Sequence, residues 1–222
     1  MRASRSLTVA AVSMLAMALT AGPALADDPV AVLTSGSAAG ADVATGDVLN
    51  AAVAAGTTAD FATASGGSTG VKCAESAFST TVVDNPAAPG VATQSTTAHT
   101  FASCTANILG VTRVTSVKVN NLPFATTISS DGVVTVSGTD AAPIRTTLVL
   151  GTLLGTVTCV FQAGGNAITG TVANADQSIN FVNQAFAKVT GPATCPGAGF
   201  FTAKYAPVVD TSVAGSPAVF TN

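Results

Sequence analysis

Residues 143–161 form the longest apolar run beyond the N-terminal segment, and this run restricts what the chain can fold into. Arg145, the repeated threonines and the two glycines Gly151 and Gly155 suit a membrane-spanning helix poorly. Residues 148–150 and 156–161 instead have the composition of two β-strands that are apolar on both faces. We therefore expect two core strands, each buried between two layers of a β-protein.

Short β-rich runs separated by turn residues fill the rest of the chain. The runs 77–83 and 91–101 flank residues 84–90, where two prolines and a terminal glycine prevent a continuous ladder, so the two runs predict a long hairpin. Asp131 followed by Gly132, between two β-branched runs, predicts a second hairpin. About ten such strands indicate an all-β fold, and we expect an antiparallel β-sandwich of the Greek-key, Ig-like or jelly-roll type with two disulfides.

The run 178–190 does not alternate evenly. Ile179 and Phe181 share one parity, whereas Phe186 has the other. An extra residue near Asn183 or Gln184 would return Phe186 to the apolar face, so we predict a β-bulge there.

The N-terminus has the three-part form of an export signal over residues 1–26. Arg2 and Arg5 precede an apolar stretch, and Ala24-Leu25-Ala26 is a small-x-small cleavage site. Removing 26 of the 222 residues leaves 196, which suits one domain with its own core. We expect a flexible lead-in over residues 27–42, a single β-domain over residues 43–222, and a secreted, extracellular product.

The charge of the chain limits the classes of partner that it can bind. Charged residues are 9% of the chain, against roughly 25% in ordinary globular domains. Without Arg2 and Arg5, six basic residues remain against 11 acidic ones, a net charge of −5 with His99 neutral. Such a composition disfavours nucleic acid and anionic membranes as partners. We expect no nucleic acid and no membrane anchor.

The four cysteines predict two disulfides, because an even number of cysteines in an exported chain usually pairs. Cys73 and Cys104 lie at comparable distances from the centre of the 84–90 turn, so the long hairpin brings them together. The remaining pair is then Cys159 with Cys195. A metal site would need close spacings such as Cys-x-x-Cys, which the sequence lacks. We expect neither a metal nor a cofactor.

Two residues are candidates for hydrolytic chemistry. Ser68 lies in Gly66-Gly67-Ser68-Thr69-Gly70, which formally matches the nucleophile-elbow pattern G-x-S-x-G. The stretch is rich in serine and glycine with no helix behind it, so a flexible loop explains it better. His99 is the single histidine and has no placed acid or nucleophile, which favours a surface or hairpin residue over a general base.

Carboxylates give little support to catalysis or to a calcium site. Glu75 is the single glutamate, and Asp84, Asp131 and Asp176 occupy turn positions that have a conformational reason for aspartate. Asn174 and Asp176 could offer oxygen ligands to calcium, yet no Asp-x-Asp ladder accompanies them, and we favour a turn. The sequence predicts no catalytic residue.

Five segments carry a resemblance: GDVLNAAVAAGTTADF, GVKCAESAF, NPAAPGVAT, FASCTANILGVTRVTSV and LLGTVTCVF. Through them the chain resembles small exported actinobacterial proteins of unassigned function, which implies a secreted two-disulfide β-domain and supplies no catalytic residue. At the level of fold it is also similar to apoproteins of the neocarzinostatin type, which are two-disulfide β-sandwiches that hold an apolar ligand.

Together these observations favour a non-enzymatic secreted protein acting through its surface or an apolar cleft, with a structural, binding or interaction role. The alternative is a secreted hydrolase using Ser68 or His99. The chain has no Trp and one Tyr, which disfavours a sugar-binding face, whereas an apolar cleft needs only Phe, Leu and Val walls. The partner would be a protein, the cell wall or a small apolar ligand, and residues 27–41 could also pair as a strand with a neighbour.

Overall fold

The computed structural model describes residues 29–222, and the export signal expected at residues 1–26 lies outside this range. The described chain is built from 16 β-strands and one 3-10 turn, Gly164–Asn166. The all-β prediction is therefore confirmed. None of the described residues belongs to a helix that is long and apolar enough to cross a membrane.

The strands are, in chain order, β1 (Leu33–Ser35), β2 (Ala41–Asp42), β3 (Val48–Ala52), β4 (Ala59–Ala62), β5 (Gly70–Asp84), β6 (Val91–Ala106), β7 (Val111–Asn120), β8 (Phe124–Ser129), β9 (Val133–Ser137), β10 (Arg145–Thr152), β11 (Gly155–Ala163), β12 (Ala167–Ala173), β13 (Ser178–Thr190), β14 (Ala198–Tyr205), β15 (Val209–Asp210) and β16 (Val219–Thr221). Both predicted hairpins are present, as β5–β6 and β8–β9.

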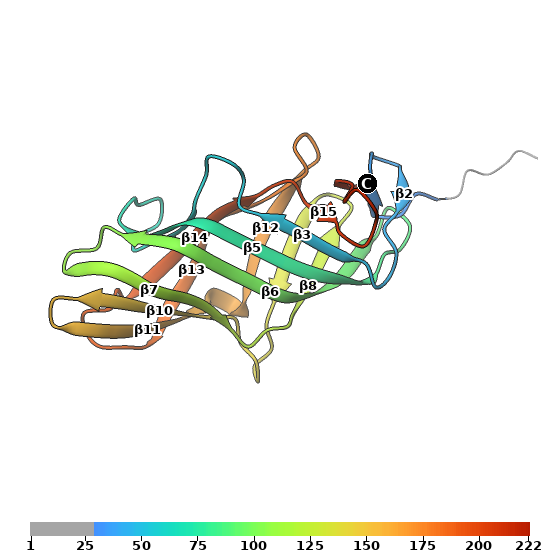
Figure 1. The fold of residues 1–222 in the computed structure, drawn as a ribbon. Coiled ribbons are helices and arrows are strands. Elements are labelled where there is room, and N and C mark those ends of the chain that lie inside the picture. The colour runs from blue at the N-terminus through green and yellow to red at the C-terminus, as the bar shows by residue number, and fades with distance from the viewer. Residues whose placement is uncertain (1–28) are drawn as a thin grey trace, which may run out of the picture.

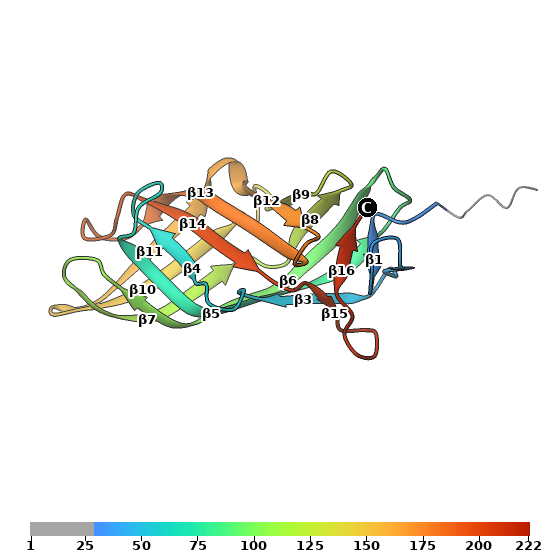
Figure 2. The same cartoon turned by 90° about the horizontal axis from the view of Figure 1, so that it is seen from above.

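Eight of these strands close into an antiparallel barrel, in the order β4-β5-β6-β8-β9-β12-β13-β14 with β14 pairing back to β4 (Figures 1 and 2). The barrel strands follow chain order, except that β7 is left out between β6 and β8, and β10 and β11 between β9 and β12. The sandwich that we expected is thus replaced by a closed sheet. Alternating strands look alike in both architectures, and the distinction comes from β12, which pairs with β9 on one side and β13 on the other.

The interior is filled because each barrel strand turns every second residue inward. On β6 the buried positions are Ala92, Gln94 and Thr96, and on β8 they are Phe124, Thr126 and Ile128. Most inward residues of the other strands are aromatic or β-branched, so the core lies along the barrel axis.

A side lobe of β7, β10 and β11 extends the sheet from the far half of β13. Residues 178–181 of β13 pair with β12, whereas residues 186–190 pair with β11. The change of partner occurs at a register shift between Phe181 and Gln184, where Asn183 has φ 49°. Asparagine tolerates this left-handed conformation better than most residues. The predicted bulge is confirmed, and Phe186 is buried.

The apolar run 143–161 forms the hairpin β10–β11, but its strands are not buried on both faces as we expected. Leu148 and its partner Cys159 are buried, as are Leu150 and Phe161, while Val149 and Val160 are partly exposed. The lobe covers the core from one side only, and its outer face meets solvent.

The segment expected to be a flexible lead-in contributes β1 and β2. Leu33 of β1 pairs with Thr221 of β16, and Ala31, Val32 and Leu33 are almost fully buried. Asn85 reinforces this contact, because its side-chain oxygen accepts a bond from the Leu33 N–H at 2.9 Å and its amide donates to the Leu33 carbonyl at 2.8 Å. The apolar segment here packs on its own sheet.

Both predicted disulfides are formed. Cys73 on β5 and Cys104 on β6 are directly paired residues of the long hairpin, with Cα atoms 3.9 Å apart. Cys159 on β11 bonds to Cys195 in the β13–β14 loop, with Cα atoms 5.7 Å apart. Bonds of this kind are typical of proteins from an oxidising compartment.

Candidate ligand-binding site

The barrel interior contains a cavity of about 60 Å³, and a second cavity of about 20 Å³ continues it along the barrel. By the measure in which one water needs roughly 10–15 Å³, the larger cavity has room for a handful of heavy atoms. Its wall is mainly aromatic and β-branched. The two cavities share the wall residues Phe78, Thr80, Gln94, Ile128 and Ile179, which we call the neck.

The neck contains two buried polar groups that have no hydrogen-bond partner within residues 29–222. They are Nε2 of Gln94 and Oγ1 of Thr80, in side chains 4% and 2% exposed. Thr80 lies on β5 and Gln94 on the neighbouring β6, and both side chains line both cavities. A buried polar group without a partner costs about 1–3 kcal/mol, so two of them facing one space make that space a candidate binding site.

Two hydroxyl groups in the wall already bond to each other. The hydroxyl groups of Thr96 and Thr126 lie 2.7 Å apart on adjacent strands β6 and β8. Each of these two hydroxyl groups thus has a hydrogen-bond partner without a ligand. Gln94 and Thr80 contribute the fully buried polar atoms of the wall that have no partner among the described residues.

His99 on β6 and Tyr205 on β14 also line the cavity, and a row of hydrogen bonds joins them to Ser76 on β5, behind the wall. Nε2 of His99 lies 2.7 Å from the hydroxyl oxygen of Tyr205, and that oxygen lies 2.8 Å from Oγ of Ser76. Phe101 packs on the imidazole with ring centroids 4.6 Å apart. His99 keeps some surface open to the cavity, but it is surrounded by protein, and this burial lowers its pKa to about 4.

Tyr205 is fully buried between His99 and Ser76, and burial raises the pKa of its phenol well above the usual range. Both Tyr205 and His99 are consequently neutral near pH 7. The wall of the larger cavity contains no Asp, Glu, Lys or Arg. The cavity is a neutral, mostly apolar space with hydrogen-bonding groups at fixed places.

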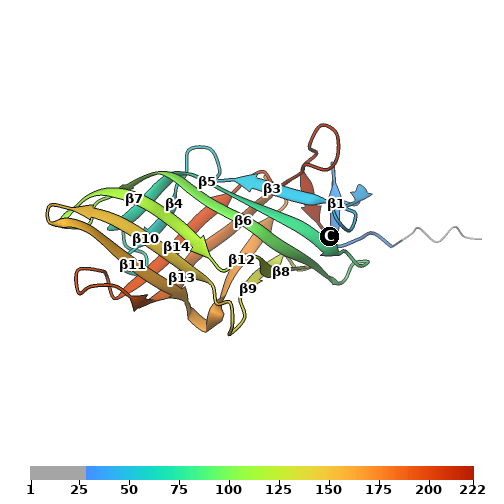
Figure 3. The same cartoon turned by 60° about the horizontal axis from the view of Figure 1, so that its bottom comes forward.

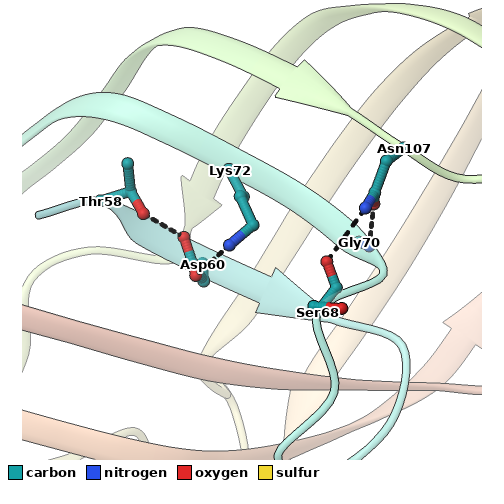
Figure 4. Close-up of polar contacts among 6 residues, drawn as sticks. All are labelled: Thr58, Asp60, Ser68, Gly70, Lys72 and Asn107. Atoms are coloured by element: carbon teal, nitrogen blue, oxygen red, sulfur yellow. Dashed lines mark hydrogen bonds and ion pairs between the residues drawn. The ribbon is translucent and has the colours of Figure 1, made fainter.

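The structure does not bring Ser68 and His99 together. Ser68 lies in the β4–β5 turn, where Asn107 donates to the Ser68 carbonyl oxygen at 3.1 Å and accepts from the Gly70 N–H at 2.7 Å (Figure 4). His99 pairs with Phe78, eight residues further along β5 than Gly70, or about 26 Å of strand. The nearest acid–base pair on the Ser68 hairpin, Asp60 with Lys72 at 3.0 Å, is an ion pair that also binds Thr58 (Figure 4).

Three of the four carboxylates singled out from the sequence have local partners. Glu75 accepts a bond from Ser103 at 2.8 Å. Asp131 accepts from Ser129, and Asp176 forms an ion pair with Lys204. Nothing in the described part of the chain gathers three His, Cys, Asp or Glu side chains into a group that could hold a metal ion.

Asn174, which was considered as a calcium ligand, also makes structural contacts. Asn174 donates to the Thr221 carbonyl oxygen at 2.7 Å and accepts from the Thr221 N–H at 3.0 Å. Its side chain thereby ties the β12–β13 turn to β16, and both of its polar atoms serve that contact.

Asp210 is a further buried carboxyl, outside the cavity. One oxygen accepts from the Ser212 N–H at 2.9 Å, and the other has no partner among the described residues. The side chain has no exposed surface but lies only just beneath it. Burial, and secondarily the neighbouring Asp47, raise the pKa of Asp210.

Sequence reasoning identified neither Gln94 nor Thr80. The signal for Gln94 was its position in the strand. Ala92, Gln94 and Thr96 occupy every second position of β6 and face the interior, whereas the residues between them are more exposed. Polar residues on the buried parity of a strand indicate a partner or a ligand. Comparisons with protein-family models, with curated proteins and with solved structures find no match.

Proposed function

We propose that this is a secreted, non-enzymatic binding protein that holds a small neutral ligand in its barrel. The observation that supports this function best is the pair of buried, unpartnered groups on Gln94 and Thr80, which face an otherwise apolar cavity. Eight-stranded barrels have interiors just wide enough to be filled by side chains or to hold one small ligand.

The chemistry of the neck selects the ligand class. Nε2 of Gln94 is a donor, and the Thr80 hydroxyl can donate or accept, so the matching group is a neutral oxygen such as a carbonyl. A carboxylate would meet no cation in the wall, and burying it unpaired would be costly. The ligand is thus a small apolar molecule that carries one uncharged oxygen.

Binding is favoured over hydrolysis because Ser68 and His99 lie far apart and the hydrogen bond of His99 goes to Tyr205. The disulfides and the export signal expected at residues 1–26 support an extracellular location. A secreted carrier or scavenger of small apolar molecules needs no catalytic residue.

The test uses cyclopentanone and its carbonyl-free counterpart cyclopentane. We expect cyclopentanone to shift the side-chain amide resonances of Gln94 in NMR spectra and to bind about tenfold more tightly than cyclopentane, the difference that one hydrogen bond confers. Gln94→Leu should abolish this preference, while Ile168→Val, a wall change away from the neck, should retain it. A barrel whose interior resonances respond to neither compound would refute the proposal.

A further inference from the structure

Three leucines are exposed at the turns of two hairpins. Leu109, in the β6–β7 turn, is 101% exposed, and Leu153 and Leu154, in the β10–β11 turn, are 88% and 100% exposed. We call these residues the leucine turns. Isolated exposed apolar residues are common on proteins, but three side chains without any cover form a cluster that requires a reason.

The two turns lie side by side. β7 and β10 are paired strands, and Val111, just after the first turn, is the partner of Thr152, just before the second. Both turns project at the end of the molecule opposite the C-terminus (Figures 1 and 3). The leucines thus point into solvent together, beyond the last paired residues.

Folding does not account for leucine at these positions. Turns normally use Gly, Asn, Asp, Ser or Pro for conformational reasons. Here the glycines meet that need, since Gly110 has φ 83° and Gly155 has φ 123°. Leu109 precedes the first glycine and Leu154 the second, and a polar residue would serve either turn equally well.

The size and shape of the leucine turns suit a lipid surface better than a protein. Three leucines offer roughly 300 Å² of apolar area by transfer energetics, well below the ~800 Å² that each partner buries in a stable protein interface. Projecting turns also offer no flat or hollow face for a complementary partner. Shallow insertion between lipid headgroups needs no such complementarity.

The two ends of the molecule differ in charge, although the half that carries the leucine turns also holds Glu75 and Asp60, the latter in an ion pair with Lys72. Arg113 lies next to the leucine turns, paired with Gly151, and its side chain lies across that glycine so closely that a Cβ there would be 2.7 Å from Arg113 Cγ. Lys188 lies on the same half of the molecule. The opposite end carries most of the acidic residues: Asp42, Asp47, Asp84, Asp131, Asp176 and Asp210.

From this arrangement we infer that the leucine turns insert into the headgroup layer of an anionic phospholipid membrane, with Arg113 contacting lipid phosphates. A negative surface would attract the half that carries Arg113 and Lys188 and repel the aspartate-rich end, so the protein would approach with its leucine turns first. The contact is peripheral and reversible, because only three side chains enter the lipid.

Co-sedimentation with vesicles tests this inference. The probes are vesicles of phosphatidylcholine alone and of equimolar phosphatidylcholine and phosphatidylglycerol. We expect the wild type to bind the mixed vesicles, and the triple variant Leu109→Ser, Leu153→Ser, Leu154→Ser to bind at least about tenfold more weakly. The control Val83→Ser, Val91→Ser removes exposed apolar side chains from the opposite end and should bind as the wild type does.

Two charge variants on β7 separate lipid contact from net charge. Arg113→Gln should weaken binding to the mixed vesicles about fivefold, the effect of one cation at an anionic surface. Lys118→Gln, the same change five residues further from the turn, should weaken it by less than about twofold, because its distance exceeds the Debye length. Unchanged melting temperatures would show that all variants are folded.

The inference would be overturned if the wild type ignored the mixed vesicles, or if the triple variant bound as well as the wild type. Self-association of the wild type that is lost in the triple variant, without vesicle binding, would assign the leucine turns to a second copy of the chain instead. None of these outcomes depends on what the barrel interior binds.

Discussion

Nε2 of His99 lies 2.7 Å from the hydroxyl oxygen of Tyr205, and the two residues come from β6 and β14, which are not neighbours in the barrel. This contact ties together parts of the chain 106 residues apart. Burial of the single histidine lowers its pKa to about 4 and so keeps it neutral near pH 7.

The first prediction concerns pH. The unfolded chain takes up a proton on His99 near pH 6.5, whereas the folded chain does so near pH 4. The contribution of His99 to the free energy of unfolding is therefore fully present above about pH 6.5. It decreases as the pH falls toward 4, by up to about 3 kcal/mol. Urea unfolding at several pH values measures this, and His99→Gln should remove the decrease. An equally steep decrease in that variant would show that another group is responsible.

The second prediction concerns Tyr205→Phe. The variant keeps the ring but removes the hydroxyl, leaving His99 and Ser76 as buried polar groups without their partner. We expect a loss of about 2 kcal/mol in the free energy of unfolding. Ser76→Ala, which leaves the bond between Tyr205 and His99 intact, should cost about half as much. Equal stabilities of Tyr205→Phe and the wild type would mean that this chain of bonds contributes nothing.

The third prediction has the opposite pH dependence. Asp210 has a raised pKa, so the folded state holds its proton more tightly than the unfolded state does. Stability from this group is present at acidic pH and is lost as the pH rises through the folded pKa. Asp210→Asn should therefore stabilise the protein at pH 7 and have little effect at acidic pH. A variant that is destabilised at pH 7 would contradict the argument.

The fourth prediction separates the two disulfides. Replacing Cys73 and Cys104 by serine opens a loop with a separation of 31 residues, and replacing Cys159 and Cys195 opens one of 36. Each change should cost about 3–4 kcal/mol on the chain-entropy model and lower the melting temperature. Only the second should also make residues 191–197 sensitive to proteases, because Cys195 attaches that loop to β11. Equal proteolysis of both variants would show that the loop is held by other contacts.

Alternation and turn chemistry predicted most of the strands, because both act over a few residues. The parity of Phe186 even located the bulge at Asn183. Closure of the sheet into a barrel could not be predicted in the same way, because it depends on β12 pairing with both β9 and β13. A local sequence pattern does not indicate which distant strand pairs with a given strand.

Only part of the candidate site could be predicted from the sequence. His99 looked like a surface or hairpin residue because its partner Tyr205 is far away in the sequence. The apolar run 143–161 predicted two core strands, but it did not reveal that the turn between them exposes Leu153 and Leu154. The net charge of −5 argued against anionic membranes, but a sum carries no information on how Arg113 and the aspartates are distributed.

The bulge at Asn183 determines which insertions and deletions β13 would tolerate during evolution. Deleting one residue there would turn Phe186 out of the core while leaving Ile179 and Phe181 in place, so a single-codon loss should be strongly disfavoured. Adding or removing residues at the β10–β11 turn would disturb no buried side chain. Homologous chains should therefore keep the spacing from Phe181 to Phe186.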